Sequence, residues 1–218
     1  MNRRLALAGL LAPLAAVLGC TSPGTANVER GFDPARTGSS VVVFSGTVTD
    51  GYVSAFWYQI ESGTGRDRRL LSVPVTGTGI TLDWSGTARD GKAFSGRLAV
   101  VELPVGVHVL RRAVGAQGAT AGFGTPPLEG EFRTAPGDVL YLGNVHATLS
   151  VDASSGRVAT SVGVVDHRDR DFAILRKQFG SALADRVRVA PLDLGRASGT
   201  KPGRLDTTID DLQGLVGR

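Results

Sequence analysis

Residues 139–151 carry the clearest alternation of apolar and polar positions in the chain. Tyr141, Val145 and Leu149 share one parity, and polar side chains fill the opposite parity after Gly143. A period of two predicts a β-strand with one apolar face. Since the opposite parity is also apolar before Gly143, we expect burial on both faces there and on one face afterwards. The pattern places a bulge or bend at Gly143.

The same alternation recurs along most of the chain and predicts an all-β fold. A turn-forming segment at 152–156 separates 139–151 from a second alternating run at 158–164, which predicts a long antiparallel hairpin. Asp50-Gly51 predicts another hairpin, and 113–125 predicts a glycine- and alanine-rich loop. Further strands are expected at 40–48, 52–60, 70–75, 80–84, 96–102, 107–112 and 131–134.

One region, 166–188, has the period of a helix. Asp166 and Asp169 are candidate N-caps, Asp171 falls in the first turn, and Gly180-Ser181 is expected to divide the region into two helices. An apolar stripe at spacings of three and four is expected to pack on the sheet: Phe172, Leu175, Phe179, Leu183 and Val187. The predicted fold class is all-β, an immunoglobulin- or transthyretin-like β-sandwich with a short packed C-terminal helical segment.

The first residues predict export from the cell. Asn2-Arg3-Arg4 is a short basic region, and an apolar run of 14 residues follows it from Leu5 to Leu18. A membrane-spanning helix needs roughly 20 residues, so the run is typical of a signal peptide. Cys20 follows the run after Gly19 and is the only cysteine in the chain. The mature monomer therefore has no disulfide and no cysteine-based metal site.

The segment Val17-Leu18-Gly19-Cys20 resembles the lipobox of bacterial lipoproteins, in which small residues precede an acylated cysteine. The resemblance implies a lipid attached at Cys20 and a protein held on the membrane of a bacterial cell envelope. Thr21 follows in place of an aspartate, which by resemblance to enterobacterial sorting implies the outer membrane, facing the periplasm. The alternative is an ordinary secretory signal with a chance cysteine.

These patterns divide the chain into four parts. We expect a lipoprotein signal peptide at 1–19, a flexible tether at 20–39, the β-sandwich domain with its helices at 40–189, and a mobile tail at 190–218. The formal net charge is +4, and arginines are spread along the whole chain. A charge so evenly distributed does not point to nucleic acid as a partner.

Candidate chemistry is sparse. His108, His146 and His167 lie far apart, and the acidic run 166–171 lacks the glycine and bidentate glutamate of a calcium loop. The chain contains no GxSxG elbow and no phosphate-binding glycine loop. Trp57 and Trp84 are expected in the core rather than on a ligand-binding face. The sequence thus points to no catalytic residue, no metal ligand and no cofactor.

Three motifs resemble a group of uncharacterised bacterial lipoproteins. The segments 103–110, 132–143 and 170–179 are similar to that group's "LPxGxYxL", "FxVxPGxVxYLG" and "xRDxxxLRKxYP" patterns. His108 stands where an aromatic is usual, and Gly180 where proline often follows the helix. The resemblance implies the sandwich fold and carries no activity.

Two functions remain open from the sequence. The first is a non-enzymatic, lipid-anchored binding or assembly module with an envelope partner, which Arg170, Arg176 and Lys177 on the outer side of the helix would contact. The alternative is a cell-envelope hydrolase with a loop-borne active site. A histidine, an aspartate and a serine within hydrogen-bond reach in a pocket would favour the enzyme. The sequence does not determine the oligomeric state.

Overall fold

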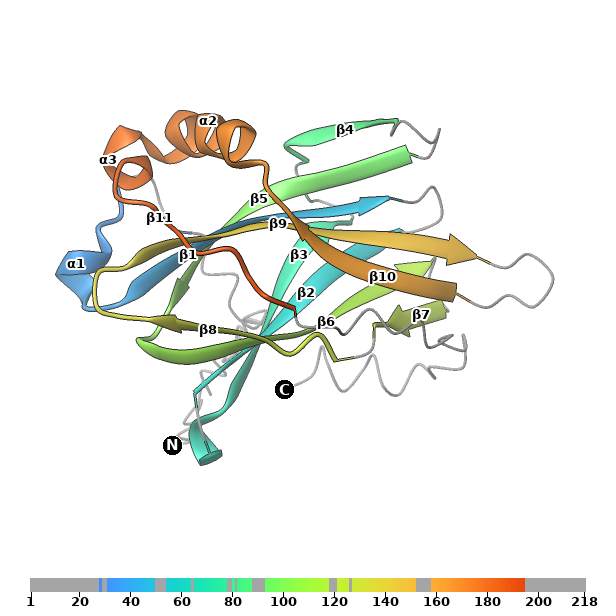
Figure 1. Ribbon diagram of the computed structural model, residues 1–218, viewed down its shortest axis with the longest axis horizontal. Helices are drawn as coiled ribbons and strands as arrows, with labels where there is room; N and C mark the ends of the chain where they lie inside the picture. The colour runs from blue at the N-terminus through green and yellow to red at the C-terminus, as the bar shows by residue number, and fades with distance from the viewer. Residues whose placement is uncertain are drawn as a thin grey trace, which may run out of the picture.

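The structure is a computed structural model that describes residues 28, 31–49, 54–63, 65–77, 80, 82–87, 93–117, 121–125, 127–151 and 158–194. The strands are β1 (Ser40–Thr49), β2 (Ala55–Ser62), β3 (Arg69–Thr76), β4 (Trp84–Thr87), β5 (Ala93–Leu103), β6 (Gly106–Gln117), β7 (Ala121–Gly124), β8 (Gly130–Thr134), β9 (Val139–Val151), β10 (Val158–Val165) and β11 (Arg188–Val189). The helical elements are α1 (Pro34–Thr37), the 3-10 turn η1 (Gly65–Asp67), α2 (Arg168–Phe179) and α3 (Ser181–Ala184). The predicted all-β class is confirmed, and the strands form two sheets in a sandwich-like architecture (Figure 1).

The first sheet has the strand order β10-β9-β1-β5-β4, with β11 also paired to β9. Strand β1 runs antiparallel to β5 and parallel to β9, and β9 and β10 form the predicted antiparallel hairpin. Every residue of β1 is buried. Its continuous β-branched run suits a central strand that is covered on both faces.

The second sheet has the order β3-β2-β6-β7, and β8 also pairs with β6. The predicted hairpin between the first two strands is wrong, because β1 and β2 lie in different sheets. β1 takes its partners from β5 and β9, and the chain then crosses to the other sheet. The turn residues Asp50-Gly51 themselves lie outside the described residues.

Two apolar cores lie on the two faces of the first sheet. The core between the sheets is formed by residues such as Phe44, Tyr58 and Leu142. The core between the first sheet and the helices is formed by residues such as Tyr141 and Leu175. Figure 1 shows α2 and α3 together over one end of the first sheet. The helices therefore cover the outer face of the sheet at that end.

Gly143 produces the change of burial along β9. Its φ of 95° lies in the region that favours glycine, and the β1–β9 register shifts at this point. A Cβ on Gly143 would lie 2.7 Å from Val164. The bulge turns Tyr141 toward the helices and Val145 toward the other sheet. The predicted bulge is confirmed, and the single continuous apolar face is wrong, since the bulge exchanges the two faces.

The helical region follows its prediction closely. Helix α2 ends before Gly180, and α3 begins at Ser181. All five residues of the predicted apolar stripe pack in the core beneath the helices. The N-cap of α2 is His167, which makes no capping bond with its side chain. Asp166 supplies one instead, because its carboxylate accepts the backbone N–H of Arg168 at 3.1 Å.

Several boundaries differ from the sequence prediction. The expected loop 113–125 is largely a hairpin, in which Gly115 of β6 pairs with Phe123 of β7. The expected strand 80–84 begins only at Trp84, and Leu82 is 39% exposed rather than inward. The loop prediction at 113–125 was wrong because the small side chains there show no clear alternation. The strand prediction at 80–84 was wrong because it depended on one short, isolated alternation.

The ends of the domain also extend beyond their predicted limits. Val28 is buried and Phe32 packs against the helix-side core, within the segment expected to be a tether. Leu192 and Leu194 are buried in the core between the sheets, within the expected tail. Residues 1–27 and 195–218 lie outside the described residues, as does Cys20.

Candidate functional site

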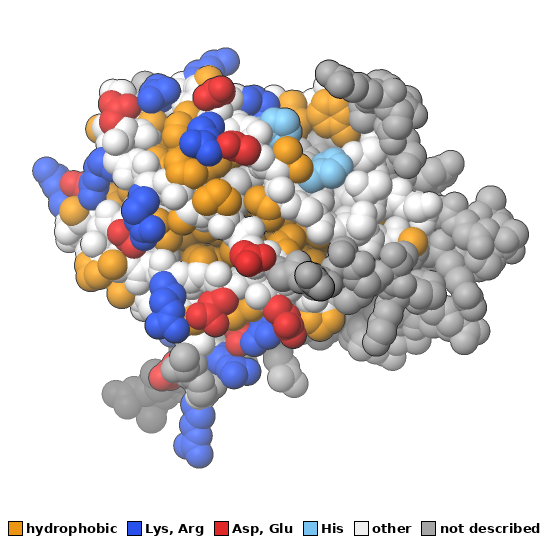
Figure 2. Space-filling model, viewed as in Figure 1, with side chains coloured by type: hydrophobic (Ala, Val, Ile, Leu, Met, Phe, Trp, Pro, Cys, Tyr) orange, Lys and Arg blue, Asp and Glu red, His pale blue; other side chains and the backbone are white. Residues whose placement is uncertain are grey.

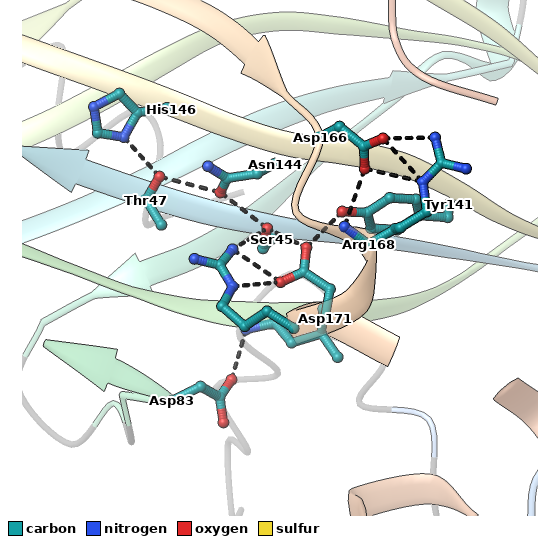
Figure 3. A network of polar contacts seen from close by, with 11 residues as sticks. Ser45, Thr47, Asp83, Tyr141, Asn144, His146, Asp166, Arg168 and Asp171 are labelled. Atoms are coloured by element: carbon teal, nitrogen blue, oxygen red, sulfur yellow. Dashed lines mark hydrogen bonds and ion pairs between the residues drawn. The ribbon is translucent and has the colours of Figure 1, made fainter. Parts of the chain in front are cut away.

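A buried polar cluster joins α2 to the first sheet, and we call its members Ser45, Tyr141, Asn144, Arg170 and Asp171 the Asp171 cluster (Figure 3). Asp171 is fully buried. Its Oδ2 accepts the Tyr141 hydroxyl at 2.6 Å and lies 2.6 Å from Ser45 Oγ, and its Oδ1 accepts Arg170 Nε at 2.9 Å. The carboxylate is thus paired and hydrogen-bonded on both oxygens, as a buried charge requires.

The Asp171 carboxylate is enclosed by protein, and the Arg170 side chain beside it is 34% exposed at a shallow depression near the start of α2. The Arg170 guanidinium lies 4.0 Å from the centroid of the Trp84 ring, in cation–π geometry. Burial, together with the hydrogen bond to the Asp171 carboxylate, raises the pKa of Tyr141 above its ordinary value, so the phenol stays neutral and donates. The oxygen of Asn144 lies 2.9 Å from Ser45 Oγ and 3.1 Å from Thr47 Oγ1. This arrangement holds the helix on the sheet.

The structure separates the three predicted partner-contact residues. Arg170 contacts Asp171 and Trp84, and its side chain is 34% exposed, so it faces outward only in part. Arg176 and Lys177 are exposed, and Arg176 pairs with Asp185 at 3.4 Å. Figure 2 shows basic and acidic side chains interspersed over the helical end of this face, without a patch of one sign.

The three histidines occupy different environments. His167 is exposed at the start of α2, beside a shallow depression of about 280 Å³. His146 on β9 lies 2.7 Å from Thr47 Oγ1 and 2.9 Å from Thr49 Oγ1. His108 is buried between the sheets. Among the residues that the structure describes, no group of three histidine, cysteine, aspartate or glutamate side chains is placed to hold a metal ion.

A pocket of about 710 Å³ lies at one end of the sandwich, and we call it the end pocket. It lies between the β2–β3 connection and the β5–β6 turn. Its lining residues are mostly apolar, with three charged side chains: Ser62, Gly63, Asp67, Arg69, Leu70, Leu71, Glu102, Leu103, Pro104 and Val105. Leu70 and Val105 are 42% and 44% exposed. A pocket of this size and lining is typical of small-molecule sites.

A second polar cluster begins at Ser62 in the wall of the end pocket and continues behind the wall with His108 and Thr134. We call it the serine–histidine cluster. Ser62 Oγ lies 2.8 Å from His108 Nδ1, and His108 Nε2 lies 3.0 Å from Thr134 Oγ1. The imidazole also stacks on Phe132, with 5.1 Å between ring centroids. Burial lowers the pKa of His108 below its ordinary value, so the neutral ring is favoured.

Sequence reasoning missed this cluster. Ser62 and His108 are 46 residues apart, and the register of β2 on β6 makes them cross-strand partners. His108 shares the parity of the buried Leu110, and this was the available signal that its side chain points inward. Nothing in the local sequence around Ser62 marks it.

No protein-family model, curated protein or solved structure matches this chain. The protein is therefore classified by its architecture alone. It is a mostly β chain of two sheets, with helices on the outer face of the first sheet. Among the described residues, no helix is long and apolar enough to cross a membrane.

Proposed function

We propose that this protein is a lipid-anchored binding module of the bacterial cell envelope, which holds a small ligand in the end pocket of an immunoglobulin- or transthyretin-like sandwich. The end pocket is the observation that supports the proposal most. It combines the volume of a small-molecule site with exposed apolar side chains at Leu70 and Val105. Large apolar side chains grouped at a hollow are unusual on a surface without a binding role.

The chemistry of the lining defines the ligand class. Leu71 and Leu103 give the pocket apolar walls, while the Arg69 guanidinium supplies hydrogen-bond donors and the Ser62 hydroxyl oxygen supplies an acceptor. A ligand that suits this lining has an apolar chain and one polar or anionic group. Arg69 makes no ion pair within the described part of the chain, so its charge is available to such a group.

A matched pair of substitutions tests the end pocket. Val105 and Val165 are both valines, 44% and 45% exposed, but only Val105 lines the pocket. We expect Val105→Trp to weaken the binding of a fluorescent fatty acid at least tenfold, measured by titration of the full-length protein. Val165→Trp should leave the affinity unchanged. Equal affinity of both variants and the wild type would refute the pocket as the binding site.

The anchor is a separate part of the proposal and has its own test. Cys20 follows a signal-peptide pattern, and lipid chains hold a protein on a bilayer through their buried methylenes. We expect Cys20→Ala to move the protein from the membrane fraction to the soluble extract and to abolish incorporation of labelled palmitate. Density-gradient separation of the two membranes tests the proposed outer-membrane location. Unchanged fractionation and lipid labelling would rule out the anchor.

An envelope partner remains part of the proposal through Arg176 and Lys177, the exposed basic side chains of α2. A partner that contacts them would present acidic groups. Cross-linking in intact cells, with wild type and the Arg176→Glu/Lys177→Glu variant compared, tests this contact. Loss of a cross-linked species only in the variant is the expected result, and an identical set of species would remove the helix from the proposed interface.

A further inference from the structure

In the serine–histidine cluster, the serine hydroxyl donates its proton to an unprotonated histidine nitrogen, which is the direction that serine acylation requires. The Thr134 hydroxyl donates to the Pro104 carbonyl at 3.2 Å and accepts the backbone N–H of Gly106 at 3.3 Å. Its remaining acceptor position faces His108 Nε2 at 3.0 Å, so Nε2 carries the proton. Nδ1 is then the unprotonated nitrogen, and it accepts the Ser62 hydroxyl proton at 2.8 Å. The network thus places a base beside a hydroxyl and fixes the tautomer of that base.

Its place in the wall of the end pocket distinguishes Ser62 from the other buried hydroxyls that the structure describes. Thr47 and Thr49 also lie beside imidazole nitrogens, those of His146, but neither lines the end pocket. In the Asp171 cluster the Tyr141 hydroxyl donates to a carboxylate that three groups share, and the helix covers it. Ser62 donates to an imidazole nitrogen and also lines the end pocket. A nucleophile, a base and a group that orients the base therefore meet at a site with room for a ligand, which is the arrangement shared by serine acyl transferases and hydrolases.

We infer that Ser62 is the nucleophile and His108 the general base of an acyl-transfer site whose substrates are carboxylic esters with an apolar chain. This inference rests on the proposed function, because it takes the end pocket as the place where the ligand binds. The apolar lining from Leu70, Leu71 and Val105 selects the apolar chain. The inference therefore favours the alternative of a cell-envelope hydrolase. Its active site would lie on paired strands rather than on loops.

The chemical steps follow from the positions of these groups. Ser62 Oγ attacks the ester carbonyl carbon and forms a C–O bond while its proton moves to His108 Nδ1. The tetrahedral intermediate collapses, the bond to the alcohol oxygen breaks, and the proton on Nδ1 passes to the departing alcohol. Water, the second substrate, then attacks the acyl-serine with His108 again as base. This releases the carboxylic acid and restores the Ser62 hydroxyl.

Arg69 is placed to stabilise the oxyanion of the tetrahedral intermediate. It is the cross-strand partner of Ser62 in the β2–β3 pair, and directly opposed residues point to the same face of a sheet. Both residues line the end pocket. A guanidinium beside the developing negative charge is an electrostatic stabiliser of this type of intermediate. Thr134 is a positioning residue, since it acts on the reacting atoms only through His108.

The inference is tested with a fluorophosphonate probe and with p-nitrophenyl octanoate on the full-length protein. We expect the probe to label Ser62, located by peptide mass spectrometry, and we expect ester hydrolysis to fall at least 100-fold in Ser62→Ala. Ser161→Ala, at an exposed serine of β10 away from the pocket, is the matched control and should change neither readout. Melting curves of both variants confirm that they fold.

Two further variants separate catalysis from packing. Thr134→Val removes the group that accepts the His108 proton, so kcat should fall while KM stays the same, and Thr134→Ser should restore kcat. Fatty-acid binding distinguishes this inference from the proposed function. A wild-type protein that binds the fluorescent fatty acid but is neither labelled at Ser62 nor active on the ester overturns the acyl-transfer site and leaves the binding module. A protein that shows neither binding nor labelling overturns both.

Discussion

The Asp171 cluster and the serine–histidine cluster are both buried polar networks, yet they differ in one respect. The Asp171 carboxylate has its partners on the sheet and on α2, and the helix covers it. Ser62 has its partner on the neighbouring strand and borders a pocket of about 710 Å³. Burial and hydrogen bonding are common to the two. The Asp171 carboxylate lines neither of the hollows described above, whereas Ser62 lines the end pocket. We therefore assign the first cluster to stability and the second to function.

Asp171→Ala should produce the largest loss of stability. It leaves the Arg170 guanidinium and the Tyr141 hydroxyl without their shared acceptor, and breaking a buried charge pair in this way costs about 3–5 kcal/mol. Ser62→Ala should cost only about 1 kcal/mol, because one neutral hydrogen bond is lost. Urea unfolding of the two variants and of Asp169→Ala, an exposed carboxylate in the same turn, measures the contrast. Comparable losses for Asp171→Ala and Asp169→Ala would contradict a structural role for the cluster.

Asn144→Asp should also destabilise the protein, although Asn144 lies on the polar parity of its strand. The residue is 2% exposed, and its side-chain oxygen and Asp171 both lie within hydrogen-bond distance of Ser45. A second carboxylate there would cost about 1–3 kcal/mol at neutral pH. Like-charge repulsion raises the pKa of the introduced carboxyl, so this cost should shrink as pH falls and that carboxyl takes a proton. A variant as stable as wild type at pH 7 would show that water reaches the cluster.

The fold shows which features a single sequence predicts well. Alternation located β9 and β10, and helical spacing located α2 and the break at Gly180, because both periods are local. The register between distant strands is not local, so the pairing of Ser62 with His108 and the separation of β1 from β2 could not be read from the sequence. Gly143 was visible as a bulge, but its exchange of the two faces depends on what each face packs against.

The orientation of charged residues was the least predictable feature. Arg170 follows Asp169 on a helix rich in charges, and helical spacing alone suggested an exposed position. Its partial inward turn depends on Asp171 and on Trp84, which is far away in sequence. The polar face of β9 was likewise read as solvated because helix cover over Asn144 cannot be deduced from that strand.

The serine–histidine cluster should make stability depend on pH, with a smaller effect than the substitutions in the Asp171 cluster. Burial lowers the pKa of His108 in the folded protein, whereas the unfolded chain has a histidine pKa of about 6.5. As pH falls through about 6.5 the unfolded state takes up a proton that the folded state refuses, so stability should decrease with a slope of at most about 1.4 kcal/mol per pH unit. Urea unfolding of wild type and His108→Gln between pH 5 and 7 measures this contribution. An identical slope in both proteins would show that His108 is not its source.

The smallest effect is expected at the outer side of α2. Arg176 and Lys177 are exposed, and exposed ion pairs contribute little, so Arg176→Glu with Lys177→Glu should change the free energy of unfolding by less than about 1 kcal/mol. Arg170→Glu should cost more, because it places a second carboxylate against Asp171. Thermal melting of the two variants compares them. Equal melting temperatures would mean that Arg170 does not belong to the Asp171 cluster.

The central claim is that the end pocket, and not the Asp171 cluster, receives the ligand, and the three histidines of the chain report on it directly. His108 contacts Ser62 in the wall of the end pocket, His146 lies beside the Asp171 cluster, and His167 is the N-cap of α2. In a ¹H–¹³C spectrum of the ring Hε1 signals, titration with 2-octanone, a ketone that cannot be hydrolysed, should shift the His108 signal alone. A shift of His146 or His167 with His108 unmoved would contradict the claim, as would three unmoved signals at saturating ketone.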